Sequence, residues 1–188
     1  HNLYLSRKDT LEDIRLTTDG EPYFSYTSNN NEKRDTACCY TSARWIDDTH
    51  MIFSFREDKR AIKTMTLVNS LSNPRPTVDT YKMPMPGDTG VSQYDICLFN
   101  ADTREQTTVP IDKYPDQKVE ISYSQTPGYV FFTRRSRPAD YIDLCRIDAR
   151  TGKVEELISE HCAPHMNIQL FKYHLINDGK EIIWWSER

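Results

Sequence analysis

Short apolar or alternating stretches, separated by polar turns, recur along this chain of 188 residues and constrain its fold more than any other feature. The clearest set comprises four predicted strands, at residues 118–123, 129–133, 141–148 and 154–158. Gly128 and Gly152 lie in the turns between them, where a glycine can adopt a positive φ. Four strands joined by short turns predict one four-stranded antiparallel sheet.

The same pattern returns on both sides of this set, with a period of about 40 to 50 residues, which is typical of β-propeller blades. An earlier copy is predicted at residues 43–56, 62–69, 94–100 and 106–110, and a shorter later copy at residues 168–186. Residues 2–5 and 14–20 form the outer half of a still earlier blade. No long stretch has helical apolar spacing. We therefore predict an all-β, partial β-propeller of about three blade-equivalents of four-stranded antiparallel sheet, with little or no helix.

The first predicted strand has no partner before it in the chain, and the last has none after it. Residues 1–188 are therefore expected to be a slice of a larger propeller, with strand edges and apolar blade faces uncovered. We expect the slice to self-associate through the edges at residues 2–5 and 182–185.

Charge and hydropathy exclude several classes of partner. The chain has 24 basic and 28 acidic residues, which gives no reason to expect a nucleic-acid partner. No apolar run approaches the roughly 18 residues that a membrane-spanning helix needs, so we expect no membrane span in this segment. The basic cluster Arg134-Arg135-Ser136-Arg137 is interpreted as a solvated hairpin turn.

The cysteines and histidines form no recognisable site. Five cysteines, including the adjacent pair Cys38 and Cys39, show no disulfide framework, and Cys97 and Cys145 are interpreted as small apolar strand residues. His161-Cys162-Ala163-Pro164-His165 lacks a second ligand pair with zinc-site spacing. We therefore predict no metal site and no cofactor.

One element breaks the repeat. Residues 71–92 contain four of the ten prolines and two of the six glycines in the chain. Proline cannot donate a backbone hydrogen bond, so this run is expected to be an insertion between strands of one blade. Such an insertion is either a rigid cover between blades or a ligand site.

At this insertion the sequence resembles a known family. Residues 70–88 are similar to a segment of the propeller of bacterial dipeptidyl peptidase IV-like proteins, which belong to the prolyl oligopeptidase superfamily. The ending Trp184-Trp185-Ser186-Glu187-Arg188 resembles the start of that family's W-S-E-R-D-G-W strand and turn. The opening Asn2-Leu3-Tyr4-Leu5 and the later Thr17-Thr18-Asp19-Gly20 resemble its N-N-L-Y and T-x-D-G pieces, in the same order.

The resemblance implies a periplasmic or cell-surface parent protein, in which an N-terminal propeller precedes an α/β-hydrolase domain with a Ser-Asp-His triad. That domain removes dipeptides from the N-termini of peptide substrates through a serine nucleophile. It is absent from residues 1–188, so we assign no catalytic residue. Ser92 follows Gly90 as in a G-x-S-x-G elbow, but the final glycine is missing.

The family's propeller carries two adjacent glutamates that hold the free ammonium group of the peptide. Here the pattern differs, because no two acidic residues are adjacent between Gly20 and Trp45. Glu21 and Glu32 are the candidate substrate-binding residues that remain. The only adjacent glutamates, Glu155-Glu156, are interpreted as a solvated strand edge.

Two functions follow from this resemblance. The first is a non-catalytic propeller segment of a serine dipeptidyl peptidase, which gates and positions peptide substrates for the hydrolase domain. The second is a peptide- or protein-binding propeller of a peptidase homologue without exopeptidase activity.

Overall fold

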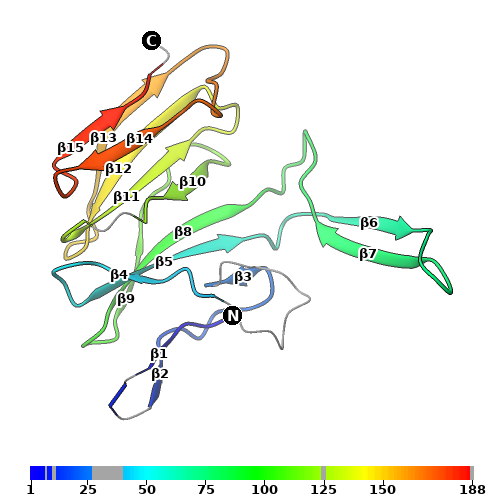
Figure 1. The fold of residues 1–188 in the computed structure, drawn as a ribbon, viewed down its shortest axis with the longest axis horizontal. Helices are drawn as coiled ribbons and strands as arrows, with labels where there is room; N and C mark the ends of the chain where they lie inside the picture. The colour runs from blue at the N-terminus through cyan, green and yellow to red at the C-terminus, as the bar shows by residue number, and fades with distance from the viewer. Residues whose placement is uncertain (7, 10–11, 27–39, 124–125, 187–188) are drawn as a thin grey trace.

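The computed structural model describes residues 1–6, 8–9, 12–26, 40–123 and 126–186, and every regular element within them is a β-strand (Figure 1). The strands are β1 (Tyr4–Ser6), β2 (Asp13–Arg15), β3 (Phe24–Ser25), β4 (Arg44–Trp45), β5 (Met51–Asp58), β6 (Thr64–Asn69), β7 (Thr77–Lys82), β8 (Gln93–Asn100), β9 (Gln106–Val109), β10 (Lys118–Ile121), β11 (Tyr129–Arg135), β12 (Tyr141–Asp148), β13 (Val154–His161), β14 (Tyr173–Ile176) and β15 (Glu181–Trp184). The prediction of an all-β chain is confirmed. The described residues contain no helix that could span a membrane.

The strands β10, β11, β12 and β13 form one antiparallel sheet in sequence order, which we call the second blade. Its strands lie where the sequence predicts them. The apolar centre of β11, from Val130 to Phe132, is at most 2% exposed. Val130 and Phe132 lie in the core between the blades, and Phe131, on the other face of the sheet, lies next to Gly179. Short turns join the strands, and Gly152 adopts a φ of 69° in the turn between β12 and β13.

The neighbouring sheet, which we call the first blade, has the order β3-β5-β8-β9, with β4 also paired to β5. The strands β3 and β4 are two pieces of one innermost strand, because both run antiparallel to β5, at its end and near its start. Eight residue pairs join β5 to β8, from Met51↔Asn100 to Asp58↔Gln93. Residues 59–92 lie between these two strands in sequence but outside the blade.

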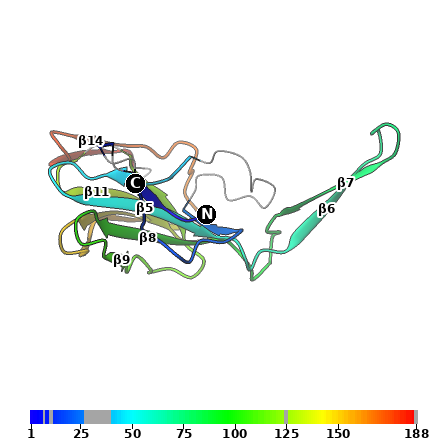
Figure 2. The ribbon, with the colours of Figure 1, turned by 90° about the horizontal axis from the view of Figure 1, so that it is seen from below.

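Residues 62–69 were predicted as a blade strand, and the structure contradicts this. Thr64–Asn69 instead forms β6, which pairs only with β7 in a two-stranded arm that extends away from the blades (Figures 1 and 2). The blade position beside β5 belongs to β8, which buries Ile96 and Phe99 completely, whereas β6 offers threonines and a largely exposed surface. The prolines of this region flank β7 and leave its six residues free to form a regular ladder.

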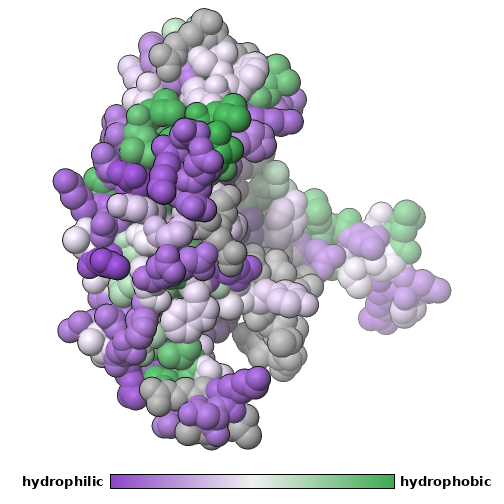
Figure 3. All heavy atoms as spheres, turned by 60° about the vertical axis from the view of Figure 1, so that its left-hand side comes forward, coloured by the Kyte–Doolittle hydropathy of each residue, from purple (hydrophilic) through white to green (hydrophobic). Residues whose placement is uncertain are grey.

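The main core lies between the two blades. It includes Phe53, Ile96 and Leu98 from the first blade, with Phe132 and Ile147 from the second. The pairs β1–β2 and β14–β15 form separate two-stranded sheets on either side. Apolar side chains reach the surface on the arm and near the C-terminal strands (Figure 3), and those with exposures above 50% include Leu67, Val68, Leu71, Val78, Leu170 and Ile183.

Candidate functional site

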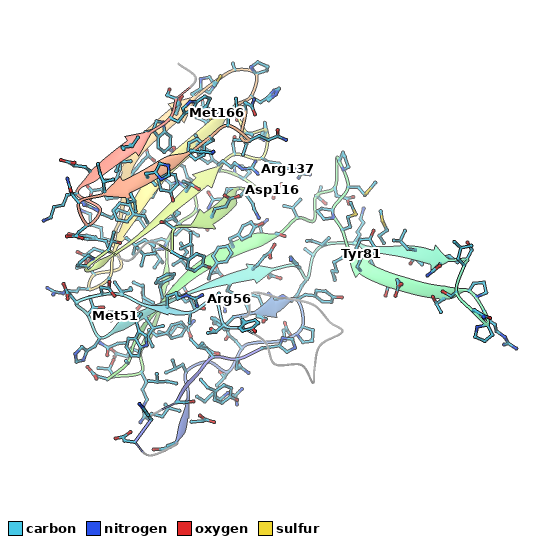
Figure 4. All side chains as sticks on the ribbon, viewed as in Figure 1. Met51, Arg56, Tyr81, Asp116, Arg137 and Met166 are labelled. Atoms are coloured by element: carbon cyan, nitrogen blue, oxygen red, sulfur yellow. The ribbon has the colours of Figure 1, made fainter. Side chains whose placement is uncertain are left out.

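One end of the two blades, which we call the rim, is the end where β5 and β11 finish and β8 and β10 begin. The arm leaves the first blade at this rim and returns to it, and the interrupted innermost strand starts there with β3. The rim also joins the blades, because the Lys118 ammonium donates to the Tyr94 hydroxyl at 2.8 Å. Arg137 lies beside Asp116 (Figure 4) and contacts it at 2.9 Å.

Just beneath the rim of the first blade, Arg56 organises a buried polar cluster. Its side chain is 9% exposed, and it donates to a single Asp95 carboxylate oxygen from Nε and Nη2, at 3.0 and 2.6 Å. Its Nη1 donates to Asp19 and to the Tyr26 hydroxyl, the latter at 2.8 Å. The Phe24 ring lies 4.0 Å from the guanidinium carbon. Every guanidinium nitrogen of Arg56 is therefore engaged inside the protein.

Burial and hydrogen bonding shift the pKa values of two groups in this cluster. Burial raises the pKa of Tyr26, so its phenol stays protonated. Burial alone lowers the pKa of Arg56, but its hydrogen bond with Asp95 and the nearby Cys97, Tyr26 and Asp95 side chains together raise it. Tyr26 and Arg56 therefore keep their protons near neutral pH, and the cluster holds the rim in place.

The structure places Glu21 on the exposed surface of the rim, in an ion pair. Its Oε1 accepts a hydrogen bond from Arg60 Nη1 at 2.7 Å, and Arg60 also contacts Asp58 at 2.6 Å. Burial opposes ionisation of Asp58, but the hydrogen bonds from Arg60 dominate and lower the pKa of this carboxyl. A peptide ammonium would therefore have to compete with Arg60 for Glu21.

Glu32 lies outside the described residues. The chain on either side of it is held firmly, because Ser42 connects the two ends of the interrupted strand. Its hydroxyl donates to the Phe55 carbonyl at 2.6 Å and lies 3.2 Å from the Tyr26 carbonyl.

The second blade contains a matching cluster around Arg134, which corrects two sequence-based interpretations. Arg134 is not a solvated turn residue, since its side chain is 9% exposed and its Nε donates to Asp143 at 2.8 Å. Glu156 is not a free strand edge either, because it accepts from Arg134 at 2.8 Å and from Lys113 at 2.7 Å. Burial opposes ionisation of Asp143, but hydrogen bonds from Arg134 and Lys113 dominate and lower its pKa.

The two clusters occupy equivalent positions. Arg56 lies directly opposite Asp95 on the neighbouring strand, and Arg134 lies directly opposite Asp143. In each third strand a buried cysteine follows the aspartate by two residues. Burial raises the pKa of the Cys145 thiol to about 12. This repeated Asp-x-Cys spacing is the sequence signal that could have identified both clusters.

At the end of the blades away from the rim, the structure has a cavity that the sequence did not predict. It has a volume of about 440 Å³ and lies between β4–β5 and the start of β11. Trp45, Phe53, Tyr123 and Tyr129 supply its aromatic lining. The Arg44 guanidinium lies 5.4 Å from the centre of the Tyr123 ring.

The remaining residues singled out by sequence do not come together. His161 stacks on Tyr141 with ring centres 4.3 Å apart, which accounts for its position. Within the described ranges, no three histidine, cysteine or acidic side chains are grouped as metal ligands. Ser92 lies in the loop before β8 and lines a cavity at the rim.

The "Dipeptidyl peptidase IV (DPP IV) N-terminal region" family matches residues 1–188. The fold is similar to that of Porphyromonas gingivalis dipeptidyl peptidase 4, with a TM-score of 0.71 and 17% identity over 92% of this chain and 25% of that one. It is also similar to a Bacteroides ovatus protein described as a dipeptidyl aminopeptidase IV, with a TM-score of 0.64 and 18% identity over 100% of this chain and 28% of that one. No curated protein matches the chain. The chain thus spans about a quarter of the length of these structures, and it belongs to the dipeptidyl peptidase IV N-terminal region family.

Proposed function

We propose that this chain is the non-catalytic propeller segment of a serine dipeptidyl peptidase, and that its rim gates and positions peptides for a hydrolase domain elsewhere in the parent protein. The observation that carries the proposal is the rim itself. The arm departs from it and the innermost strand begins there before its interruption, although the blades beneath have regular strand pairing. Insertions on a rigid scaffold are where binding residues concentrate.

The first test is an activity measurement. The 188-residue chain should not hydrolyse a dipeptidyl-proline chromogenic substrate, because the nucleophile, base and oxyanion hole would come from the hydrolase domain. The full-length protein should hydrolyse it, and replacement of its nucleophilic serine should abolish turnover. Turnover that tracks the purified 188-residue chain would refute the assignment.

The second candidate is a peptide- or protein-binding propeller without exopeptidase activity. The observation in its favour is that Glu21 already forms an ion pair with Arg60, so the described rim offers no pair of free carboxylates for a peptide ammonium. Full-length protein that binds peptides but does not release dipeptides would support this candidate over the first.

The amine site can be tested directly. If Glu21 or Glu32 holds the peptide ammonium, its replacement by Gln in the full-length protein should raise KM more for peptides with a free N-terminus than for N-blocked ones. A charged hydrogen bond of roughly 1.5–3 kcal/mol corresponds to at least a tenfold change. We expect no such selectivity for Glu21→Gln, because Arg60 already occupies this carboxylate.

Two further properties are part of the proposal. Because of the family to which the chain belongs, we propose that the parent protein is periplasmic or displayed at the cell surface. Fractionation of the producing cells would test this.

We also propose that the 188-residue chain self-associates at micromolar concentration through β1 and β15, where Tyr4 and Ile183 are 53% and 56% exposed. Sedimentation as a monomer, with slow amide exchange in both strands, would contradict this second part.

A further inference from the structure

The groove between the blades at the rim holds an excess of positive charge. A cavity of about 220 Å³ opens there, and its charged lining residues are Lys118, Arg135, Arg137 and Asp116. Three cations therefore face one carboxylate. Asp116 is already bonded to Arg137 at 2.9 Å and accepts from Gln93 at 3.3 Å.

Two of these cations are placed against each other by the sheet. Lys118 lies directly opposite Arg135 in the register of β10 and β11. Like charges in this position destabilise a sheet. The Lys118 ammonium donates to the neutral Tyr94 hydroxyl at 2.8 Å and lies 4.7 Å from the centre of that ring. Within the described part of the chain, Arg135 has no acidic partner.

The surroundings of the cavity do not neutralise these cations. Asp88, on the returning leg of the arm, forms its ion pair with Lys63 at 3.0 Å, while its backbone carbonyl accepts from Arg137 at 2.7 Å. Gln117 is 4% exposed. Its side-chain nitrogen donates to the Ile111 carbonyl, and its side-chain oxygen accepts hydrogen bonds from backbone amides of its own loop. The Ser92 hydroxyl adds a further donor to the lining. An anion entering the cavity would thus meet three cations from the second blade and hydroxyl groups from the first.

We propose that this cavity, the rim cavity, binds a peptide carboxylate, which is either an acidic side chain or the C-terminal carboxylate. The inference rests on the proposed function, because the rim is the face assigned to peptides. Arg135 presents a planar donor group suited to a carboxylate, and Lys118 supplies a second charge beside it. The bound anion would relieve the repulsion between the two cations. Peptides with a carboxylate at the right distance from their N-terminus would be preferred.

The test uses the full-length protein and hexapeptides with Gly-Pro at the N-terminus, whose second peptide bond is N-methylated to prevent cleavage. One pair differs only by Glu or Gln at position five, with an amidated C-terminus. A second pair has Gly at positions three to six and ends in a free acid or an amide. Calorimetry should show at least about tenfold tighter binding for the carboxylate member of one pair, and this preference should shrink in high salt. The pair that shows the preference identifies the source of the carboxylate.

Variants assign the preference to the rim cavity. Arg135→Gln should remove most of it, and Arg135→Lys should retain part of it because the charge is kept. Arg150→Gln, in the exposed turn at the other end of the same blade, is the matched control and should leave the preference unchanged. The unfolding midpoint of Arg135→Gln should be no lower than that of Arg150→Gln, because the substitution removes the repulsion from Lys118. This measurement separates lost binding from lost structure.

Three outcomes would overturn the inference: equal binding within both peptide pairs, a preference that survives in Arg135→Gln, or a preference lost equally in Arg150→Gln. Turnover of a Gly-Pro anilide, which has no carboxylate, separates this inference from the proposed function. Normal turnover without a carboxylate preference refutes the rim cavity alone. A carboxylate preference without any turnover supports the rim cavity and refutes the peptidase assignment.

Discussion

The two blades share a buried pattern but differ in what is inserted into them. Each has an arginine on its second strand that faces an aspartate on its third, Arg56–Asp95 in the first blade and Arg134–Asp143 in the second. The second blade joins these strands through a short turn, whereas the first inserts residues 59–92. The first blade also has a divided innermost strand.

This difference shows that the connections between strands can lengthen while the strand pairing of a blade is kept. The arm departs from the rim and the innermost strand is divided just below it, yet the ladder between β5 and β8 remains in register over all eight pairs. The arginine clusters lie just inside the rim, where their ion pairs connect neighbouring strands near the strand ends. We infer that they allow long connections to be inserted without loss of the sheet, and the predictions below test this inference.

The largest expected effect comes from breaking the second-blade cluster. Arg134→Met should lower the free energy of unfolding by about 3–5 kcal/mol, because it removes the main partner of Asp143, whose side chain is fully buried. Arg56→Met should cost less, about 1–3 kcal/mol, since Asp95 and Asp19 are 35% and 46% exposed. Urea denaturation of the 188-residue chain measures both. Equal losses of stability in the two variants would show that the cost of removing the arginine does not depend on how deeply its acidic partner is buried.

The second prediction concerns acid stability. The pKa of Asp143 is lower in the folded protein, so its contribution is present above the unfolded-state pKa of about 3.9 and is lost as the pH falls through the folded-state value. Asp143→Asn should lower the free energy of unfolding by about 2 kcal/mol at pH 7. It should also flatten the decline of stability below pH 4. An acid titration that keeps the slope of the parent chain would contradict this assignment.

Much of the fold could be predicted from sequence, and the exceptions have physical causes. The second blade was predicted strand by strand because its apolar stretches alternate with glycine-containing turns. The partner of Thr64–Asn69 could not be predicted, since a strand pattern does not specify which neighbour it pairs with. Arg134 looked like a surface residue because its acidic partners, Asp143 and Glu156, are distant in sequence. The sequence identified Glu21 as a candidate site residue. Its ion pair with Arg60 could not be predicted, because it also joins residues that are distant in sequence.

A smaller effect should distinguish two turns at the end opposite the rim. Gly179 has a φ of 76°, and a Cβ atom there would lie 2.9 Å from Thr126 Cγ2 and 3.0 Å from Phe131 Cε2. Gly179→Ala should therefore cost about 1–2 kcal/mol. Gly128→Ala is the matched control, because its φ of 75° is similar but no atom lies within 4 Å of the added Cβ. If both variants lose the same stability, the contact between β14–β15 and the second blade is not tight.

The smallest effect is expected at the rim surface itself. Glu21→Gln should change the free energy of unfolding by less than about 0.5 kcal/mol, because its ion pair with Arg60 is exposed to solvent. The measurement is again urea denaturation, with Glu155→Gln as the control for a second exposed ion pair. A loss above about 2 kcal/mol would mean that Glu21 supports the divided strand structurally.

The most direct test of a peptide-positioning rim is hydrogen exchange of the full-length protein, with and without a peptide that is not cleaved. We expect slower amide exchange at the rim, in residues 56–63, 90–95 and 116–118, when the peptide is bound. Exchange at the opposite end of the same blades, in residues 101–105 and 149–153, should stay unchanged. Protection confined to that opposite end, or no change at the rim at saturating peptide, would contradict the account.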